Sequence, residues 1–464
     1  MRILSRRTCG IFASAAVAAL VLAGCTAGDS ATGPAPSAVD TAAGASHAPV
    51  TISLWSPWTG NEYKKFQEVF KGFEKQYPWI TVDVKGGIPD DKLIAGINSG
   101  KPPDVAISFG VDNIGKYCQS GAWQDLNPYI KGADGLDLAK TFPASALTYT
   151  SFNGVQCSLP FLTDSFGMYL NDDQLAKAGI TAPPKTLDEL QADAKKLTTF
   201  DANGNITHAG FVPWFGYYCC SLSSVNVGNI FGATWYNSDG TSAFATDPAW
   251  VQAFNWQKQF VSDVYGNGDF QAGLVKLKKF VAGAADEWGC SQDFIKGRIS
   301  MSIDGEWRNV MMRDCKYNFT YSTAPWPVPA DKPELYGSGT SGGTTMGMPR
   351  GAAHPAEAWL LIRYLTSQTE PLVYMANLIN NVPTTFDSLQ SPDLKLPKQF
   401  QVFMDVYQNP KSQYRPSTAI GDADEQAMGK LMEKWQNGSI TDIQAGLADA
   451  AKQVDTATQQ VATP

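Results

Sequence analysis

Apolar and polar positions in the body of the chain follow two periods, one typical of strands and the other typical of helices. In residues 50–55, Val, Ile and Leu alternate with Thr and Ser, which predicts a half-buried strand. Residues 62–77 repeat aromatic and aliphatic side chains three and four positions apart, which predicts an amphipathic helix that ends at Pro78. The succession continues with predicted strands at 80–84 and 104–108 and a predicted helix at 92–99. Strands that alternate with helices are typical of α/β layers with parallel pairing.

Three later helices are predicted, two from the signals at their starts and one from its apolar stripe. Thr186 and Glu189 stand at the first and fourth positions of a capping box. Asp247 before Pro248 is a helix N-cap followed by a proline at the first helical position. An apolar stripe over residues 443–454 predicts the last helix.

The first 25 residues read as an export signal rather than as part of the fold. Three arginines precede an apolar run at residues 11–22, which is shorter than the roughly 20 residues of a membrane span. The Leu-Ala-Gly-Cys sequence that ends at Cys25 resembles the bacterial lipobox, which implies cleavage before Cys25 and a diacylglycerol on its sulfur. Residues 26–48 are small, polar and proline-rich, so we predict a flexible tether. Export by the general secretory route and by the twin-arginine route both stay open.

Composition excludes several functional classes. The chain has 464 residues, which corresponds to two or three folding units. Its 36 Lys and Arg against 44 Asp and Glu give a net charge of −8, so no nucleic-acid partner is expected, because such proteins need a basic face. Three histidines are too few and too scattered for a histidine-rich metal site. The runs at 337–343 and 201–205 lack the context of a dinucleotide fingerprint, a nucleophile elbow or a calcium loop, so we predict no cofactor and no metal.

Six cysteines remain when Cys9 and Cys25 are set aside, and an even number in an exported chain indicates disulfides. They are Cys118, Cys157, Cys219, Cys220, Cys290 and Cys315. We predict Cys118–Cys157 as one bridge and expect Cys290 and Cys315 to pair with the neighbouring Cys219 and Cys220. Free buried thiols are the alternative, whereas a zinc site is not expected because the Cys-x2-Cys spacing is absent.

Longer stretches of the chain resemble a known family. TISLWSPWTGNEYKKFQEVFKGFEKQYPWITVDV and KLIAGINSGKPPDV are similar to the start of family 1 extracellular solute-binding proteins, the maltose- and oligosaccharide-type receptors of ABC importers. Later landmarks follow in family order: LPFLTDSFGMYLNDDQLAKAGITAPPKTLDEL, DFIKGRISMSIDGEWRN and HPAEAWLLIRYLTS. The resemblance covers roughly residues 50–455 and implies a type II periplasmic-binding-protein-like α/β fold. In that fold two lobes, each a mostly parallel sheet with flanking helices, are hinge-linked by three crossovers, and ligand binds between them.

The resemblance divides the chain into a leader and two discontinuous lobes. Residues 1–24 are the expected signal peptide, and residues 25–48 are the lipidated cysteine and its tether. The expected lobes are 49–159 with 326–368 for the N-terminal lobe, and 160–325 with 369–464 for the C-terminal lobe.

The resemblance also implies ligand-binding residues in the loops and strand ends between the lobes. These are Trp58, Thr59, Asn61, Gly110, Asp112, Phe161, Asp164, Glu306, Trp307, Gly342, Gly343 and Arg415. This chain has Thr344 where many relatives place a tryptophan. A surface salt bridge is the alternative role for Arg415, and a place in the core is the alternative for Trp307.

Aromatic residues favour a carbohydrate ligand on chemical grounds. Pyranose rings present apolar C–H faces ringed by hydroxyls, so aromatic rings beside planar polar groups suit them. Trp214 lies in a stretch that proline and glycine break, and Trp288 and Trp307 flank a strand-like segment, so all three are predicted in the site. Trp250 and Trp359 fall on helical apolar stripes and are predicted in the core.

We therefore predict a lipid-anchored receptor on the extracellular face of the cell membrane, a monomer and not an enzyme. It captures a carbohydrate, an oligosaccharide, by lobe closure and delivers it to a membrane permease. The permease and its ATPase are expected to be separate chains, since this sequence has neither a membrane bundle nor a Walker A loop. Two alternatives stay open: a secreted glycosidase with Asp164 and Glu306 as its paired carboxylates, and a receptor of the same fold for a non-sugar solute.

Overall fold

The computed structural model describes residues 47–217, 221–284 and 287–462. The predicted signal peptide, Cys25 and all of the predicted tether except its last two residues lie outside the described residues, as do Cys219 and Cys220. Within the described ranges, no helix combines the length and the apolar character that crossing a bilayer requires.

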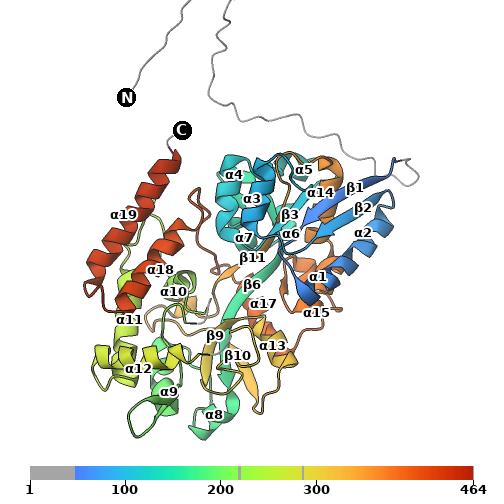
Figure 1. Cartoon of the computed structure of the whole chain (residues 1–464). Helices are drawn as coiled ribbons and strands as arrows, with labels where there is room; N and C mark the ends of the chain where they lie inside the picture. Colours follow the sequence, from blue (N-terminus) through green and yellow to red (C-terminus); the bar gives the residue numbers. More distant parts are fainter. Residues whose placement is uncertain (1–46, 218–220, 285–286, 463–464) are drawn as a thin grey trace, which may run out of the picture. The chain divides into compact units, whose positions relative to one another are not determined.

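Three parallel strands form one side of the main sheet (Figure 1). β1 (Val50–Trp55) pairs with β2 (Ile80–Lys85) on one edge and with β3 (Val105–Ser108) on the other. The strands and the parallel pairing predicted for this part are confirmed. The helix predicted between β1 and β2 is present as α1 (Gly60–Phe66), the 3-10 turn η1 (Gln67–Val69) and α2 (Phe70–Gln76).

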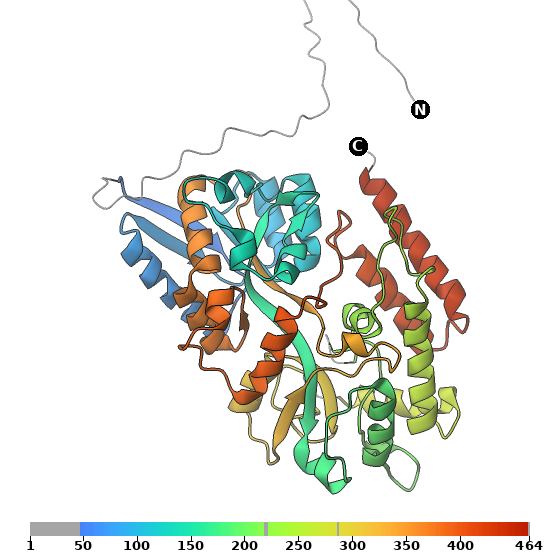
Figure 2. The same cartoon turned by 180° about the vertical axis from the view of Figure 1, so that it is seen from behind.

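β6 (Ser158–Asn171) is the long central strand of the sheet (Figures 1 and 2). Its first half pairs with β11 (Ser341–Gly347) and β12 (Val382–Pro383), and its second half pairs with β9 (Met301–Gly305) and β10 (Tyr321–Ala324). All of these pairs are antiparallel, as is the pairing of β11 with β3. The sheet is therefore mixed rather than mostly parallel, because the neighbours of β6 come from segments that return along it in the opposite direction.

The remaining elements lie on either side of β6 in the sequence. Before β6 are α3 (Asp90–Asn98), η2 (Val111–Asn113), α4 (Ile114–Ser120), α5 (Asn127–Ile130), α6 (Leu138–Thr141), α7 (Ala144–Thr148) and the hairpin of β4 (Ser151–Phe152) and β5 (Val155–Gln156). After β6 are α8 (Asp172–Lys177), α9 (Leu187–Leu197), β7 (Thr199–Phe200), β8 (Ile206–His208), α10 (Ser224–Phe231), α11 (Pro248–Val264), α12 (Phe270–Ala282), α13 (Arg308–Asp314), η3 (Pro333–Leu335), α14 (Pro355–Ser367), α15 (Thr369–Ile379), α16 (Phe386–Leu389), η4 (Lys398–Phe400), α17 (Gln401–Gln408), α18 (Ala423–Gln436) and α19 (Ile443–Ala462).

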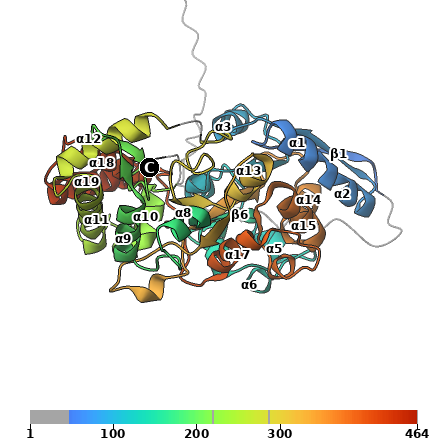
Figure 3. The same ribbon diagram turned by 90° about the horizontal axis from the view of Figure 1, so that it is seen from below.

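The helices form two groups around β6. The first group consists of helices that each contact at least one other member: α9, α10, α11, α12, α18 and α19. The second group packs on the sheet, where α14 contacts β3, β6 and β11. α17 packs against β6 (Figure 3). β6 runs unbroken past the predicted lobe boundary at residue 160, and α15, which the prediction gives to the second lobe, packs against α1, η1 and α14 of the first. The lobe boundaries stay a prediction.

The three later helices and the two core tryptophans predicted from the sequence are confirmed. Thr186 and Glu189 form the predicted capping box at the start of α9, and the Asp247 side chain accepts a hydrogen bond from the N–H of Ala249 at the start of α11. The last predicted helix is α19. Trp250 and Trp359 are buried, as predicted, with 0% and 3% exposure.

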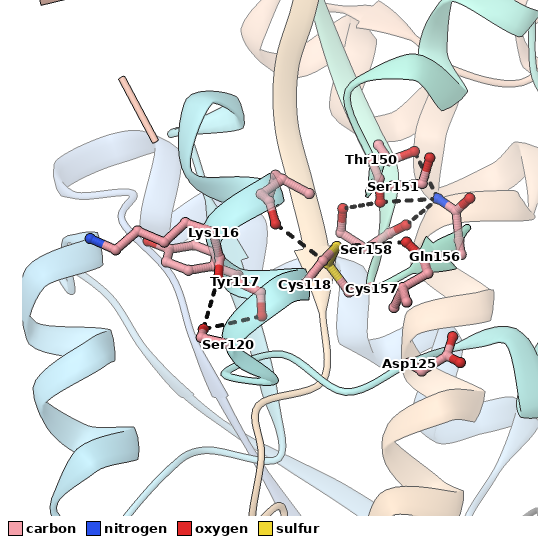
Figure 4. The surroundings of a disulfide bond; sticks show 12 residues. Lys116, Tyr117, Cys118, Ser120, Asp125, Thr150, Ser151, Gln156, Cys157 and Ser158 are labelled. Atoms are coloured by element: carbon pink, nitrogen blue, oxygen red, sulfur yellow. Dashed lines mark hydrogen bonds between the residues drawn. A yellow bond between two sulfur atoms is a disulfide. The ribbon is translucent and has the colours of Figure 1, made fainter. Parts of the chain in front are cut away.

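Two disulfides link described cysteines. Cys118 and Cys157 form the predicted bridge between α4 and the residue before β6 (Figure 4). Cys290 and Cys315 form the second bridge, so the prediction that they pair with Cys219 and Cys220 is wrong. Their Cα atoms lie 5.4 Å apart, within the span of a disulfide, because α13 carries Cys315 back to the segment that contains Cys290.

Candidate functional site

Two carboxyl groups and one amide meet beside the middle of β6. Asp164 belongs to β6 and is half-buried, and Glu306 follows β9 and is fully buried. The side-chain amide of Asn381 donates hydrogen bonds to Asp164 Oδ1 at 2.6 Å and to Glu306 Oε1 at 2.7 Å. The backbone N–H of Ser165 donates to Glu306 Oε2 at 2.8 Å. One amide nitrogen therefore holds both predicted carboxyl groups in place.

Burial governs the protonation of this pair. Removal from water raises the pKa of Asp164 to about 6, although hydrogen bonds with Glu306 and Asn381 act in the opposite direction. Burial also raises the pKa of Glu306 well above its ordinary value, and the negative charge of Asp164 raises it further. The pair therefore keeps a proton at a pH where separate carboxyl groups have lost theirs. A carboxylic acid beside a carboxylate offers a donor and several acceptors to a hydroxylated ligand.

Three aromatic rings follow one another from the strands that carry the carboxyl pair. The half-buried ring of Trp307 meets Phe166 of β6 edge to face, with 5.3 Å between ring centroids. A Cβ atom on Gly305 would lie 2.3 Å from the Trp307 ring, so this ring folds back over the end of β9. The Trp288 side chain is 52% exposed, and its ring centroid lies 6.0 Å from that of Trp307. Trp307 thus packs against the core and also adjoins an exposed ring, and its contact with a ligand stays a prediction.

The loop after β1 places Trp58 in a buried aromatic cluster. Trp58 is 4% exposed and contacts Phe161 of β6 and Phe109 edge to face, each at 5.8 Å between centroids. Phe161 is fully buried at a β-bulge, where β11 pairs with the residues on both sides of Phe161. Phe109, which follows β3, is 50% exposed, so it is the most exposed of these three rings.

Three further predicted residues lie near this cluster. Thr59 is exposed at the N-cap of α1, and Asn61 belongs to α1. Gly110 follows Phe109 and is half-buried, with its N–H donating to the Ser108 side chain. Their expected contacts with a ligand stay a prediction.

Arg415 is buried, so the alternative of a surface salt bridge is excluded. Its Nη2 donates to Asp112 Oδ1 at 3.0 Å, and its Nη1 lies 2.8 Å from Asp424 Oδ1. The Tyr414 hydroxyl donates to the same Asp112 oxygen at 2.6 Å. The terminal nitrogens of Arg415 are therefore engaged by the protein, and Asp112 accepts hydrogen bonds from both Arg415 and Tyr414.

The two predicted glycines lie in β11 at the middle of the sheet. Gly342 pairs with Asp164, and a Cβ atom on Gly342 would lie 2.8 Å from the Tyr414 ring. Gly343 has φ +147°, and a Cβ atom there would lie 2.7 Å from the backbone nitrogen of Asp164. Glycine at these positions lets Tyr414 and β6 approach the strand closely. Hydrogen bonds from their amides to a ligand stay a prediction.

Trp214 lines a cavity of about 590 Å³ between its own loop and α18. Polar residues of this cavity include Ser223, Ser224, Lys278, Glu425, Gln436 and Asn437. Glu425 Oε2 lies 3.9 Å from Arg415 Nε, so the cavity adjoins the Asp112–Arg415 contacts. Burial and the charge of Asp112 raise the pKa of Glu425 to about 7.

We call Asp164, Phe166, Glu306, Trp307 and Asn381 the β6 site. Trp288 and Gly342 adjoin members of the β6 site, Trp288 at Trp307 and Gly342 at Asp164. Asp112 and Arg415 are connected to it less directly, because Tyr414, which bonds to Asp112, lies against Gly342. Trp58 contacts β6 at Phe161, and Trp214 lines the cavity beside Arg415.

Sequence reasoning missed three residues of this region, which are Phe109, Asn381 and Tyr414. Phe109 had a local signal, since it is an aromatic residue directly after a predicted strand. Tyr414 stands next to the predicted Arg415 and could have been included with it. Asn381 had no local signal of function, because an Asn-Asn pair before Val-Pro reads as the end of a helix.

The chain is similar in sequence and in fold to known proteins. A family profile described as bacterial extracellular solute-binding protein matches residues 68–402. The maltotriose-binding protein of Pyrococcus abyssi is 22% identical over 346 residues, which cover 74% of this chain and 68% of the relative. A maltooligosaccharide ABC transporter solute-binding lipoprotein of Streptococcus pneumoniae is 26% identical over 274 residues, 57% of each chain. The solved structure of CpMnBP1 with mannotriose bound has a TM-score of 0.71 at 24% identity and covers 87% of this chain and 99% of its own. The fold class predicted from the sequence is confirmed, with a mixed sheet.

Proposed function

Because this chain belongs to the bacterial extracellular solute-binding protein family, we propose that it captures a carbohydrate, an oligosaccharide, for an ABC importer. The relatives that match it include binding proteins for maltotriose and for maltooligosaccharides, and also a binding protein for sn-glycerol-3-phosphate. In this proposal the protein binds its ligand without chemical change and delivers it to a separate permease and ATPase as a monomer.

The β6 site is the observation that carries the proposal. It places the half-buried ring of Trp307 next to two carboxyl groups that an amide holds in a fixed position. Aromatic faces suit the apolar side of a sugar ring, and carboxyl and amide groups suit its hydroxyls. We propose that Trp288 and Trp307 stack on the sugar and that Asp164 and Asn381 bind its hydroxyls, with Glu306 holding both in position.

Residues on both sides of the β6 site complete the proposed pocket. Phe109, Thr59, Asn61 and Gly110 would approach the ligand from the first part of the chain, and Trp214 from the cavity beside α18. We propose that these surfaces belong to two lobes with the boundaries given above, and that ligand contacts on both lobes favour a closed form.

The same geometry argues against the glycosidase alternative. A glycosidase places its two carboxyl groups on opposite sides of the bond that it cleaves, about 5–10 Å apart. Here a single amide nitrogen bonds to both carboxyl groups, and a backbone N–H occupies the second oxygen of Glu306. Asp164 and Glu306 also hydrogen-bond to each other, so no substrate bond fits between them in this arrangement.

A thermal-shift and calorimetric panel tests the proposal. The mature protein is titrated with maltotriose, mannotriose, their monosaccharides, spermidine and a ferric chelate. Binding to one of the oligosaccharides, with no product released on long incubation, supports the proposal; at 100 times Kd the ligand should add about 2.7 kcal/mol of stability. Binding of spermidine or the chelate alone would favour the non-sugar receptor, and release of shorter sugars would favour the glycosidase.

We further propose that the protein is held on the extracellular face of the cell membrane by a lipid on Cys25. The lipobox resemblance and the lipoprotein of Streptococcus pneumoniae among its relatives support this proposal. Replacing Cys25 with Ala should release the protein from the membrane fraction or leave the precursor uncut. A membrane-bound, normally processed Cys25→Ala variant would refute the proposal.

A further inference from the structure

Trp288 lies in a surface segment of turns, yet its ring has a defined neighbour. The segment between α12 and β9 contains no regular helix or strand among its described residues. The ring of Trp288 nevertheless lies 6.0 Å from the Trp307 ring, with 35° between the two planes. Something other than secondary structure must therefore hold Trp288 in place.

Two links fasten this segment to the two ends of α13. The Arg308 Nη2 donates to the backbone carbonyl of Glu287 at 3.0 Å. Arg308 is itself fully buried, and its Nε lies 2.5 Å from Asp304. On the other side of Trp288, Cys290 is bonded to Cys315, the residue that follows the last turn of α13. Trp288 thus stands between two fixed points, each one or two residues away.

We propose that the Cys290–Cys315 disulfide positions Trp288 for ligand binding, so that Trp288 and Trp307 form one aromatic surface. This inference rests on the proposed function. A ring that is already held loses little conformational freedom when a sugar stacks on it, whereas a mobile ring has to be immobilised. Because Cys290 is exposed, the bond is also open to thiol reductants.

The Cys118–Cys157 disulfide provides a matched control (Figure 4). It is buried and packs in a separate apolar cluster with Tyr117 and Trp123. The two disulfides join residues 39 and 25 positions apart, so they restrict the unfolded chain to a similar extent. Serines in place of the buried pair add the cost of burying hydroxyls, so this control should be destabilised at least as much. Of these two bonds, only Cys290–Cys315 begins two residues from Trp288, an aromatic residue of the proposed site.

The first test needs no ligand. Near-ultraviolet circular dichroism of the mature protein, minus that of its Trp288→Phe variant, reports the coupling of the Trp288 and Trp307 rings. The same difference is measured for each double variant, with and without Trp288→Phe. We expect it to be lost in Cys290→Ser/Cys315→Ser and kept in Cys118→Ser/Cys157→Ser, although the second double variant melts at a temperature at least as low. An unchanged difference signal in Cys290→Ser/Cys315→Ser would overturn the inference.

The second test measures affinity for maltotriose and mannotriose by calorimetry. We expect Cys290→Ser/Cys315→Ser to weaken binding about 2- to 12-fold, the cost of immobilising one side chain. The same double change in a Trp288→Ala background should weaken binding no further, because the disulfide acts through that ring. An equal loss in both backgrounds would overturn the inference. If the unaltered protein binds neither sugar, the proposed function fails, and the dichroism result still decides whether the disulfide positions Trp288.

Discussion

At the scale of single residues, the chemistry of the β6 site depends on how Asn381 orients two carboxyl groups. Asn381 follows Asn380, which has a left-handed backbone with φ 53° at the end of α15. Because α15 ends in this turn, the Asn381 side chain points toward Asp164 of β6. Because the Asn381 amide donates to Asp164 and Glu306 together, the like charges are brought close, and they stay close only if they share a proton.

The shared proton predicts an unusual dependence of stability on pH. Asp164 has a pKa of about 6 in the folded protein, against about 3.9 for an aspartate in an unfolded chain. The folded state therefore binds the proton more tightly, so the contribution of Asp164 to stability falls as the pH rises from about 4 to about 6. Asp164→Asn keeps an oxygen for Asn381 and cannot ionise. We expect Asp164→Asn to be more stable than the unaltered protein at pH 7, by on the order of 2 kcal/mol, and equally stable near pH 4.

Urea denaturation at pH 4 and pH 7 measures this difference. Asp201→Asn serves as a control of opposite sign, because hydrogen bonds from Asn205 and Asn203 lower the pKa of the exposed Asp201. That variant should lose stability at pH 7 and lose less at pH 4. A gain for Asp164→Asn that is the same at both pH values would contradict the proton-sharing account.

At the scale of elements, the sequence predicted single strands and helix starts, which depend on a few consecutive residues. It did not predict the contacts between segments that are far apart in the chain. β1, the capping box of α9 and the start of α11 were predicted because their determinants lie within a few consecutive residues. The antiparallel neighbours of β6 come from segments far along the chain, so no local period reveals them. The same holds for Asn381 and for the pairing of Cys290 with Cys315, since both depend on where helices end in space. Family resemblance, rather than periodicity, is what pointed to Asp164 and Glu306.

The junction of β9 and α13 carries its own prediction through Trp307. Its ring rests on the strand end and on Phe166, and it is only half-buried. Trp307→Ala should weaken sugar binding about 5- to 150-fold, by analogy with the stacking of bases on aromatic rings. Its loss of stability should be smaller than the roughly 3–5 kcal/mol of a fully buried tryptophan. Melting temperature and calorimetric affinity, measured on the same preparations, separate the two effects.

Trp250→Ala is the control for this measurement. Trp250 is fully buried in α11, so its removal should lower stability by the full core amount and leave affinity unchanged. If Trp307→Ala instead binds sugar normally and melts as early as Trp250→Ala, Trp307 is a core residue and not part of the pocket.

At the scale of the whole molecule, one buried ion pair connects the two proposed lobes. Asp112 follows β3 in the N-terminal lobe, whereas Arg415 precedes α18 in the C-terminal lobe and also pairs with Asp424 of that helix. The Asp112 side chain is 22% exposed and that of Arg415 is 1% exposed, so the pair is poorly screened by water. A contact that exists only when the lobes are near each other favours the closed arrangement over the open one.

Breaking that pair should therefore shift the molecule toward open forms. Asp112→Asn keeps an acceptor for Tyr414 and removes the charge that faces Arg415. We expect its unliganded form to have a larger radius of gyration in small-angle X-ray scattering, and its affinity for sugar to fall about 5- to 150-fold, the range of a coupling of about 1–3 kcal/mol.

Arg298→Gln is the matched control, since it breaks the Arg298–Asp293 pair within the proposed C-terminal lobe, where the N···O distance is 2.6 Å. It should lower stability without changing the radius of gyration. An Asp112→Asn variant with unchanged radius and affinity would show that this ion pair does not hold the lobes together.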